Sequence, residues 1–201
     1  MADVLCLFYS RTGTTRRVMN DIAGELQAEC VEITDGLDRT GTLGYFLCGM
    51  DAVRHGTRPL KPYETERPLG DYKLVLLGTP VWAGRCSSIM RGLLKRRGLE
   101  LSRVGYVVTC GGDPTKQEAV FRQMDLYTAA PRMAEVSLRY GDSGYHFALD
   151  AFLTRVRAAL DEIGEVAPGD GEVIEFVPPV AEKSPPKRRR AAKIKKEEDH
   201  V

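Results

Sequence analysis

The sequence contains no apolar run that could cross a membrane, because its longest apolar segments are far shorter than the roughly 20 residues that a membrane helix requires. It also lacks a basic N-terminal region ahead of an apolar core, so we expect no secretory signal peptide. The five cysteines are scattered, odd in number and without a Cys-x-x-Cys pair, which argues against a disulfide framework or a thiolate metal site. These absences favour a protein of the reducing cytoplasm.

Two common nucleotide-binding signatures are also missing. No glycine-rich loop ends in Gly-Lys-Ser or Gly-Lys-Thr, so a kinase-type phosphate loop is not supported, and the dinucleotide fingerprint Gly-x-Gly-x-x-Gly is absent. The three histidines show no spacing typical of metal ligands. Any nucleotide or metal chemistry would therefore have to use a different arrangement of residues.

Charge divides the chain unevenly. The net charge is +1, but residues 182–201 contain eight Lys/Arg against four Asp/Glu, which leaves 21 against 24 in residues 1–181. We predict a folded domain over 1–165, a linker or short extension over 166–181, and a basic disordered tail over 182–201. The tail could contact nucleic acid or an anionic surface, although a solvated tail is favoured because it contains no aromatic residue to stack on bases.

The segment Tyr9–Thr15 lies between an apolar strand-like run, Val4–Phe8, and an amphipathic helical pattern that begins near Arg16. A hydroxyl-rich loop that opens into a helix offers unpaired backbone N–H groups at the positive end of the helix dipole, which suits a phosphate group. An ordinary turn with a Ser/Thr cap is the alternative. Arg16 and Arg17 oppose the dipole unless an anion binds there or their side chains turn away.

Strand and helix patterns alternate through the rest of the body. We expect strands at 31–33, 74–78, 104–109 and 133–138, and helices at 43–53, after a Ser87 or Ser88 cap, at 117–127, and in a last segment with apolar residues Phe147, Ala151, Phe152, Val156, Leu160 and Ile163. This alternation predicts a parallel sheet covered by helices on both faces. Ligands of such sheets bind beyond the carboxyl ends of the strands, where the loops after strands one, three and four meet.

With these loops placed, the sequence resembles the flavodoxin family over about residues 3–163. The resemblance lies in Ser10-Arg11-Thr12-Gly13-Thr14-Thr15 after the first strand and in Thr79-Pro80-Val81-Trp82 after the third. It implies a flavodoxin-like doubly wound α/β fold, with a five-stranded parallel sheet of order 2-1-3-4-5 and helices on both faces. It also implies FMN at the point where the strand order reverses.

The resemblance further implies a role for each loop. The first loop would hold the FMN phosphate, the second would place Trp82 on the flavin ring, and the backbone of the third would approach the pyrimidine edge. The residues concerned are Ser10, Arg11, Thr12, Gly13, Thr14 and Thr15, then Thr79, Pro80, Val81, Trp82, Ala83 and Gly84, and finally Cys110, Gly111, Gly112 and Asp113. Trp82 could instead be a core or interface residue.

Two departures from the family bear on activity. Lys116 or a neighbour stands where a typical small flavodoxin has a second stacking tyrosine, and Ala83 stands where a glycine often assists the one-electron-reduced flavin. The body also lacks a strongly acidic surface for docking to basic partners. These features favour a flavin-dependent oxidoreductase, of the type that passes electrons from NAD(P)H to a quinone, over an electron carrier with a dedicated redox partner protein. A scaffold that binds another phosphate and a homodimer through residues 35–70 also remain open.

Overall fold

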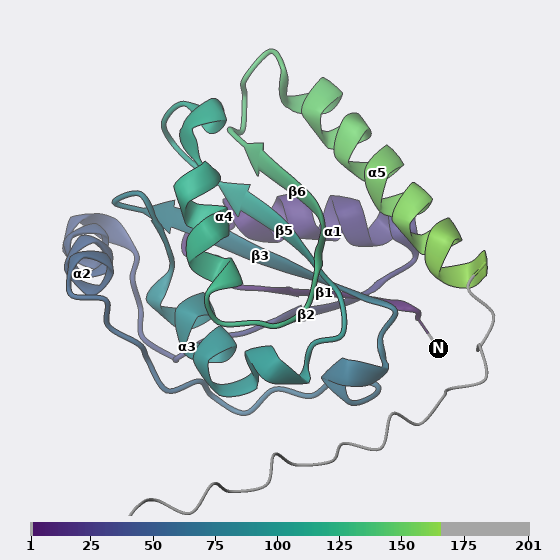
Figure 1. Ribbon diagram of the computed structural model, residues 1–201. Coiled ribbons are helices and arrows are strands. Elements are labelled where there is room, and N and C mark those ends of the chain that lie inside the picture. The colour runs from purple at the N-terminus through teal and green to yellow at the C-terminus, as the bar shows by residue number, and fades with distance from the viewer. Residues whose placement is uncertain (1, 166–201) are drawn as a thin grey trace, which may run out of the picture. The chain divides into compact units, whose positions relative to one another are not determined.

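The computed structural model describes residues 2–165, and the expectations for 166–181 and 182–201 lie outside the described residues. Strands and helices alternate along most of the described chain, as the sequence predicts (Figure 1). The strands are β1 (Val4–Phe8), β2 (Glu29–Glu32), β3 (Leu74–Trp82), β4 (Arg85–Cys86), β5 (Val104–Thr109) and β6 (Arg132–Leu138). The helices are α1 (Thr14–Leu26), α2 (Gly41–Val53), α3 (Ser88–Arg97), α4 (Glu118–Asp125) and α5 (Tyr145–Glu165), with short 3-10 turns at Leu69–Asp71, Gly98–Glu100 and Pro114–Lys116.

Five strands form a parallel sheet in the order β2-β1-β3-β5-β6. Because β5 and β6 are the fourth and fifth strands of the prediction, the predicted order 2-1-3-4-5 is confirmed. The sixth strand, β4, was not predicted: it has two residues and pairs antiparallel with the end of β3, with Trp82 opposite Arg85. Strand β3 runs beyond the predicted Gly78 because its parallel pairing with β5 continues to Pro80 and the hairpin with β4 adds Val81 and Trp82.

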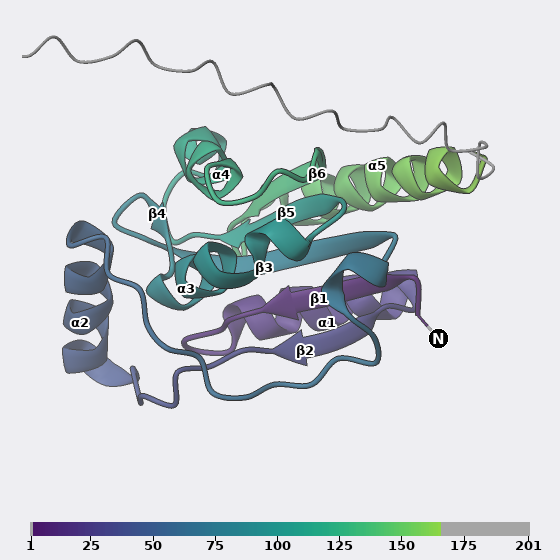
Figure 2. The same cartoon turned by 60° about the horizontal axis from the view of Figure 1, so that its bottom comes forward.

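Helices cover both faces of the sheet, as Figures 1 and 2 show. On one face α1 and α5 pack with the alternate side chains Val4, Cys6 and Phe8 of β1. On the other face α3, α4 and the inner side of α2 pack with Leu5 and Leu7. Strands that are buried on both faces read as continuous apolar runs, which is why β1 and β3 were easy to find in the sequence.

The last helix differs from its predicted apolar face at one position. Phe147 is 81% exposed, whereas Leu149, Phe152 and Val156 are buried against the sheet. Phe147 lies in the first turn of α5, and the period of 3.6 residues per turn brings Leu149, Phe152, Leu153 and Val156 onto the buried stripe instead. Within residues 2–165, no helix combines the length and apolar character needed to span a bilayer.

Candidate functional site

The first loop holds its shape through a single side chain. Gly13 adopts a left-handed backbone conformation with φ of 91° and precedes the first residue of α1, and its N–H donates to the Ser10 hydroxyl at 3.1 Å. A residue other than glycine would be strained at this φ. Beyond it, the N–H groups of Thr14 and Thr15 lie in the first turn of α1, where a helix leaves its amides without partners in its own backbone. The loop is therefore a concave set of amides and hydroxyls.

The two arginines that follow are engaged by side chains outside this loop. Arg16 forms an ion pair with Glu32 at 2.6 Å, and the Arg17 guanidinium lies 4.8 Å from the centre of the Tyr140 ring. Their charges are thus paired elsewhere and do not need an anion at the helix start. Evidence for an anion site must come from the amides and from the other residues that line the loop.

Thr15 links the first loop to the end of the fourth predicted strand. Its hydroxyl lies 2.8 Å from the hydroxyl of Thr109, the last residue of β5, and both residues are buried. This contact joins residues that are 94 positions apart and fixes the distance between the first and third loops. The sequence did not single out Thr109.

The second loop is a tight hairpin between β3 and β4. Ala83 and Gly84 have φ of 47° and 71°, so both turn residues are left-handed, as in the two-residue turns that match the twist of paired strands. Thr79 lies behind this loop and is buried: its hydroxyl donates to the Ser87 hydroxyl at 3.0 Å and accepts from the Ser87 N–H at 3.1 Å. Ser87 in turn caps α3 by accepting from the Met90 N–H.

Trp82 is only 7% exposed, and part of its indole lines the site. The edge of the Tyr9 ring meets the indole with ring centres 5.7 Å apart, and the Arg39 guanidinium lies 5.8 Å from the indole centre. Trp82 is therefore a core residue and a lining residue at once, so the two roles weighed from the sequence are not exclusive. Burial raises the pKa of Tyr9 to about 12 although the Arg39 charge acts in the opposite direction.

The third loop follows β5 and is exposed. Gly111 and Gly112 have open space where a side chain would stand, and the Cys110 thiol donates to the Gly112 carbonyl at 3.5 Å. Asp113 is directed elsewhere, because its carboxylate accepts from the N–H and the hydroxyl of Thr115 and so caps a 3-10 turn. Backbone groups, more than side chains, are what this loop presents.

A cavity of about 440 Å³ lies where the loops meet. Its volume falls within the range of about 300–1,000 Å³ that is usual for small-molecule sites. Ten of the residues singled out in the sequence line it: Ser10, Arg11, Thr12, Thr14, Thr15, Pro80, Val81, Trp82, Cys110 and Gly111. The other six, Gly13, Thr79, Ala83, Gly84, Gly112 and Asp113, belong to the same loops but do not line the cavity.

Four further lining residues were not identified from the sequence: Tyr45, Thr109, Arg139 and Tyr140. Arg139 and Tyr140 directly follow β6, so the rule that ligands bind beyond strand ends could have found them. Tyr45 comes from α2, and no pattern in the sequence indicated that this helix reaches the cavity. Tyr45 and Tyr140 therefore add two aromatic side chains to the cavity, and neither comes from the third loop, where the sequence indicated that a stacking tyrosine is missing. Within residues 2–165, the side chains that line the cavity include two arginines and no carboxylate.

A network of charged residues holds the segment that carries α2. Arg39 is buried and pairs with Asp35 at 2.6 Å and with Asp51 at 3.2 Å, while Arg58 pairs with Asp51 at 2.9 Å. Burial lowers the pKa of Arg39, but the hydrogen bond and charge of Asp35 outweigh this effect and leave it above its ordinary value. The Arg39 carbonyl accepts from the Arg11 guanidinium at 3.2 Å, which connects the network to the first loop.

The sequence matches no protein-family model and no curated protein. Solved structures do resemble this fold. A flavoprotein from Lactobacillus acidophilus NCFM in complex with FMN is 19% identical, with 74% of this chain and 99% of that chain covered and a TM-score of 0.55. A flavoprotein from Bacteroides uniformis is 16% identical (78% and 98% covered, TM-score 0.60), and a WrbA-like flavodoxin from Agrobacterium tumefaciens is 12% identical (80% and 97%, TM-score 0.54). The chain thus has a flavodoxin-like fold.

Proposed function

We propose that this chain binds FMN in the cavity between its first, second and third loops and uses it as an oxidoreductase. The observation that carries the proposal is the mixed lining of one cavity. Hydroxyl side chains from the loop at the start of α1, which suit a phosphate, and aromatic side chains, which suit a flat ring, line the same cavity. A solved flavoprotein that shares the fold was crystallised with FMN.

The phosphate would lie at the start of α1. Ser10, which already orders the loop through Gly13, and the hydroxyls of Thr12, Thr14 and Thr15 would act there together with the amides of the first turn. Backbone dipoles can hold a phosphate without a paired cation, which agrees with Arg16 and Arg17 being engaged elsewhere. Arg11 lines the same cavity and adds one positive charge.

The ring would lie between the second and third loops. Trp82, held by Tyr9 and Arg39, would offer a rigid aromatic surface, and the glycines after Cys110 would let their backbone approach the ring edge. Tyr45 and Tyr140 would flank the open side of the cavity. Bound FMN would supply the redox chemistry, while the protein would supply binding, orientation and a local electrostatic field.

Electron transfer from NAD(P)H to a quinone-type acceptor is the redox role that we propose, with a carrier that serves a redox partner as the second candidate. The cavity opens to solvent beside the exposed rings of Tyr45 and Tyr140, which gives a small substrate room to approach. A carrier that steers to basic partners would need a strongly acidic surface. Residues 1–181 contain 21 Lys/Arg and 24 Asp/Glu, which is close to neutral.

An FMN titration tests the cofactor. The purified chain should quench FMN fluorescence, and it should bind FMN much more tightly than riboflavin, which lacks the phosphate. Thr12→Val should weaken FMN binding and leave riboflavin binding unchanged. Thr57→Val, an exposed threonine outside the cavity, is the matched control. No binding by the unaltered chain would sink the proposal.

The redox role needs a second assay. Steady oxidation of NADH or NADPH by the FMN-loaded chain with a soluble quinone would support the enzyme. A one-electron-reduced form that persists during anaerobic titration, together with no turnover of NAD(P)H, would instead assign the carrier role.

A further inference from the structure

Helix α2 places its large apolar side chains outward. Tyr45 is 71% exposed, Phe46 62% and Val53 66%, and Leu43 and Leu47 are exposed as well. The buried side of the helix consists of small residues, Gly44, Cys48 and Ala52. A surface helix normally has the opposite arrangement, with its bulky apolar residues toward the core. Exposure of the outward face of α2 to water is therefore unfavourable.

The inward side must be small because the chain passes close beneath it. A Cβ atom added at Gly44 would lie 2.1 Å from the carbonyl group of Arg39, whose side chain belongs to the buried charge network. The helix thus cannot rotate to bury its bulky face without losing this contact. Figures 1 and 2 both show α2 at the periphery, with the rest of the described chain on one side of it.

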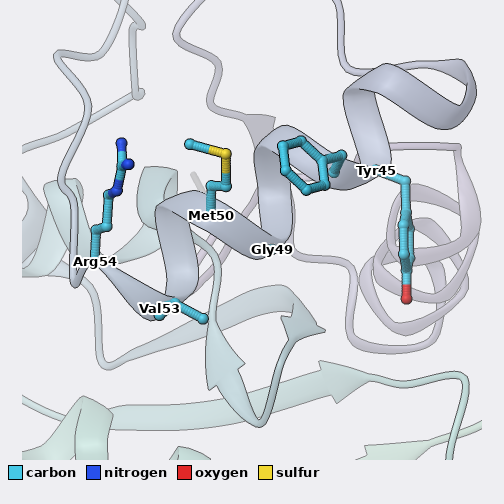
Figure 3. Close-up of a pocket in the computed structure, with 6 residues that line it drawn as sticks. Tyr45, Gly49, Met50, Val53 and Arg54 are labelled. Carbon is cyan, nitrogen blue, oxygen red and sulfur yellow. The ribbon is translucent and has the colours of Figure 1, made fainter.

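On the outward face, the exposed Phe46 side chain stands beside the open space that Gly49 leaves. A groove of about 330 Å³ runs along it, lined by Tyr45, Phe46, Gly49, Met50, Val53 and Arg54 (Figure 3). Gly49 has open space where its side chain would stand, one turn after the exposed ring of Phe46. Thr42, Phe46, Gly49 and Val53 follow a spacing of four, three and four residues, which is the spacing of a helix-pairing seam.

Such a seam is complementary to itself. If two copies of α2 lie antiparallel with Phe46 opposite Gly49 of the second copy, the same register places Thr42 opposite Val53. Both contacts then occur twice about a two-fold axis, which is the commonest symmetry of homodimers. The five exposed apolar residues of α2 leave accessible on the order of 600 Å² per copy, and the three that line the groove, Tyr45, Phe46 and Val53, contribute roughly two thirds of it, against about 800 Å² per partner in a standard interface.

We propose that α2 is the interface of a homodimer, in which two copies pair antiparallel through Phe46 and Gly49. A membrane surface fits the face less well. Among the described residues, Arg54 is the only charged residue that lines the groove, whereas helices that lie on membranes carry a row of Lys/Arg beside their apolar face.

The interface would reach the candidate cofactor site. Tyr45 lines the α2 groove on one side and the cavity between the loops on the other, and the Arg11 guanidinium lies 5.6 Å from the centre of its ring. A second copy that packs on α2 would hold this ring at the cavity rim and so strengthen FMN binding. This coupling rests on the proposed function, but the dimer itself does not, and its test requires no FMN.

Sedimentation equilibrium of the full-length chain, without FMN and at micromolar concentration, is the test. The unaltered chain should have twice the mass of one chain, and Phe46→Glu should have the mass of one, with an unchanged circular dichroism spectrum because the side chain is exposed. Phe147→Glu is the matched control, since Phe147 is an exposed phenylalanine on α5, and it should remain dimeric. A monomeric unaltered chain, dissociation by Phe147→Glu as well, or a monomer that sediments with neutral lipid vesicles would overturn the proposal.

Thiol cross-linking tests the register. In a Cys30→Ser background, which removes an exposed native thiol, Thr42→Cys together with Val53→Cys should form disulfide-linked dimers on mild oxidation. The antiparallel register separates the two Val53 positions. A cross-link that forms as readily with Val53→Cys alone would therefore overturn this arrangement.

Discussion

The hydrogen bond between the hydroxyls of Thr15 and Thr109 gives a prediction in which folding stability and FMN affinity respond differently to the same substitutions. The perturbation is Thr15→Val and Thr109→Val, singly and together. Each change keeps the shape of the side chain and removes one hydroxyl from a buried contact of 2.8 Å. The single variants leave the other hydroxyl buried without its partner, while the double variant removes both.

The magnitudes follow from this difference. A buried hydroxyl that loses its partner costs about 1–3 kcal/mol, whereas replacing both partners with apolar groups is nearly neutral. We therefore expect both single variants to lose about 1–3 kcal/mol of unfolding free energy in urea titrations and the double variant to regain most of it. FMN binding should behave differently, because Thr15 belongs to the first turn of α1, whose amides would hold the phosphate, whereas Thr109 ends β5.

In FMN titrations, Thr15→Val and the double variant should lose a hydrogen bond to a charged group, about 1.5–3 kcal/mol, which is roughly a 10- to 100-fold rise in Kd. Thr109→Val should bind FMN nearly as well as the unaltered chain, at temperatures where it is folded. The reasoning fails if the double variant is less stable than either single variant. It fails also if the double variant recovers FMN affinity together with stability.

Two further predictions concern the loops around the site. Ala83→Asn should raise the unfolding free energy measured in urea by about 0.5–1 kcal/mol, because Asn tolerates the left-handed conformation that Ala83 adopts before Gly84. An unchanged unfolding free energy would contradict the backbone strain at Ala83. Burial raises the pKa of Asp51, but hydrogen bonds from Arg58 and Arg39 outweigh burial and hold that pKa below its ordinary value of 3.8. The stability that Asp51 contributes is therefore complete above about pH 4 and is lost as the pH falls through the folded-state pKa. Asp51→Asn should lower the unfolding free energy by about 3 kcal/mol at neutral pH, because it removes one carboxylate partner of buried Arg39. It should also flatten the acid limb of a curve of stability against pH. Equal acid limbs in the variant and the unaltered chain would contradict this role of Asp51.

The sheet was predictable because its signal is local and strong. Strands such as β1 and β3 are buried on both faces, so they read as unbroken apolar runs, and right-handed crossovers leave few orders for them. The hairpin strand β4 could not be found in this way. It has two residues, and its existence depends on two consecutive left-handed residues, one of which is an alanine that gives no warning in the sequence.

The site was predictable where it lies on the loops after β1, β3 and β5, and not where distant segments enter it. The place of Tyr140 just after the edge strand β6 follows from the strand-end rule, but the contact of its ring with the guanidinium of Arg17 in α1 is one that no spacing rule reveals. Tyr45 comes from the region between 35 and 70, whose path depends on ion pairs among Asp35, Arg39 and Asp51. Ion pairs between side chains carry no periodic signal, so the sequence predicted a helix at 43–53 within a long connection but not how that helix is held against the rest of the described chain.

The helix α2 shows why the sequence predicts a helix between residues 35 and 70 but not which of its sides faces the core. Its apolar residues lie on both sides, so hydrophobic periodicity does not say which side faces the core, and side-chain size decides instead. Gly44, Cys48 and Ala52 face inward because the backbone at Arg39 leaves no room, and this forces Phe46 and Val53 into solvent. The small residues on the core side leave room for the Arg39 backbone and its ion pairs, and the bulky apolar side chains are left in water, which is unfavourable. In the proposed homodimer, a second copy of the same helix would cover these side chains without moving the ion pairs of Arg39.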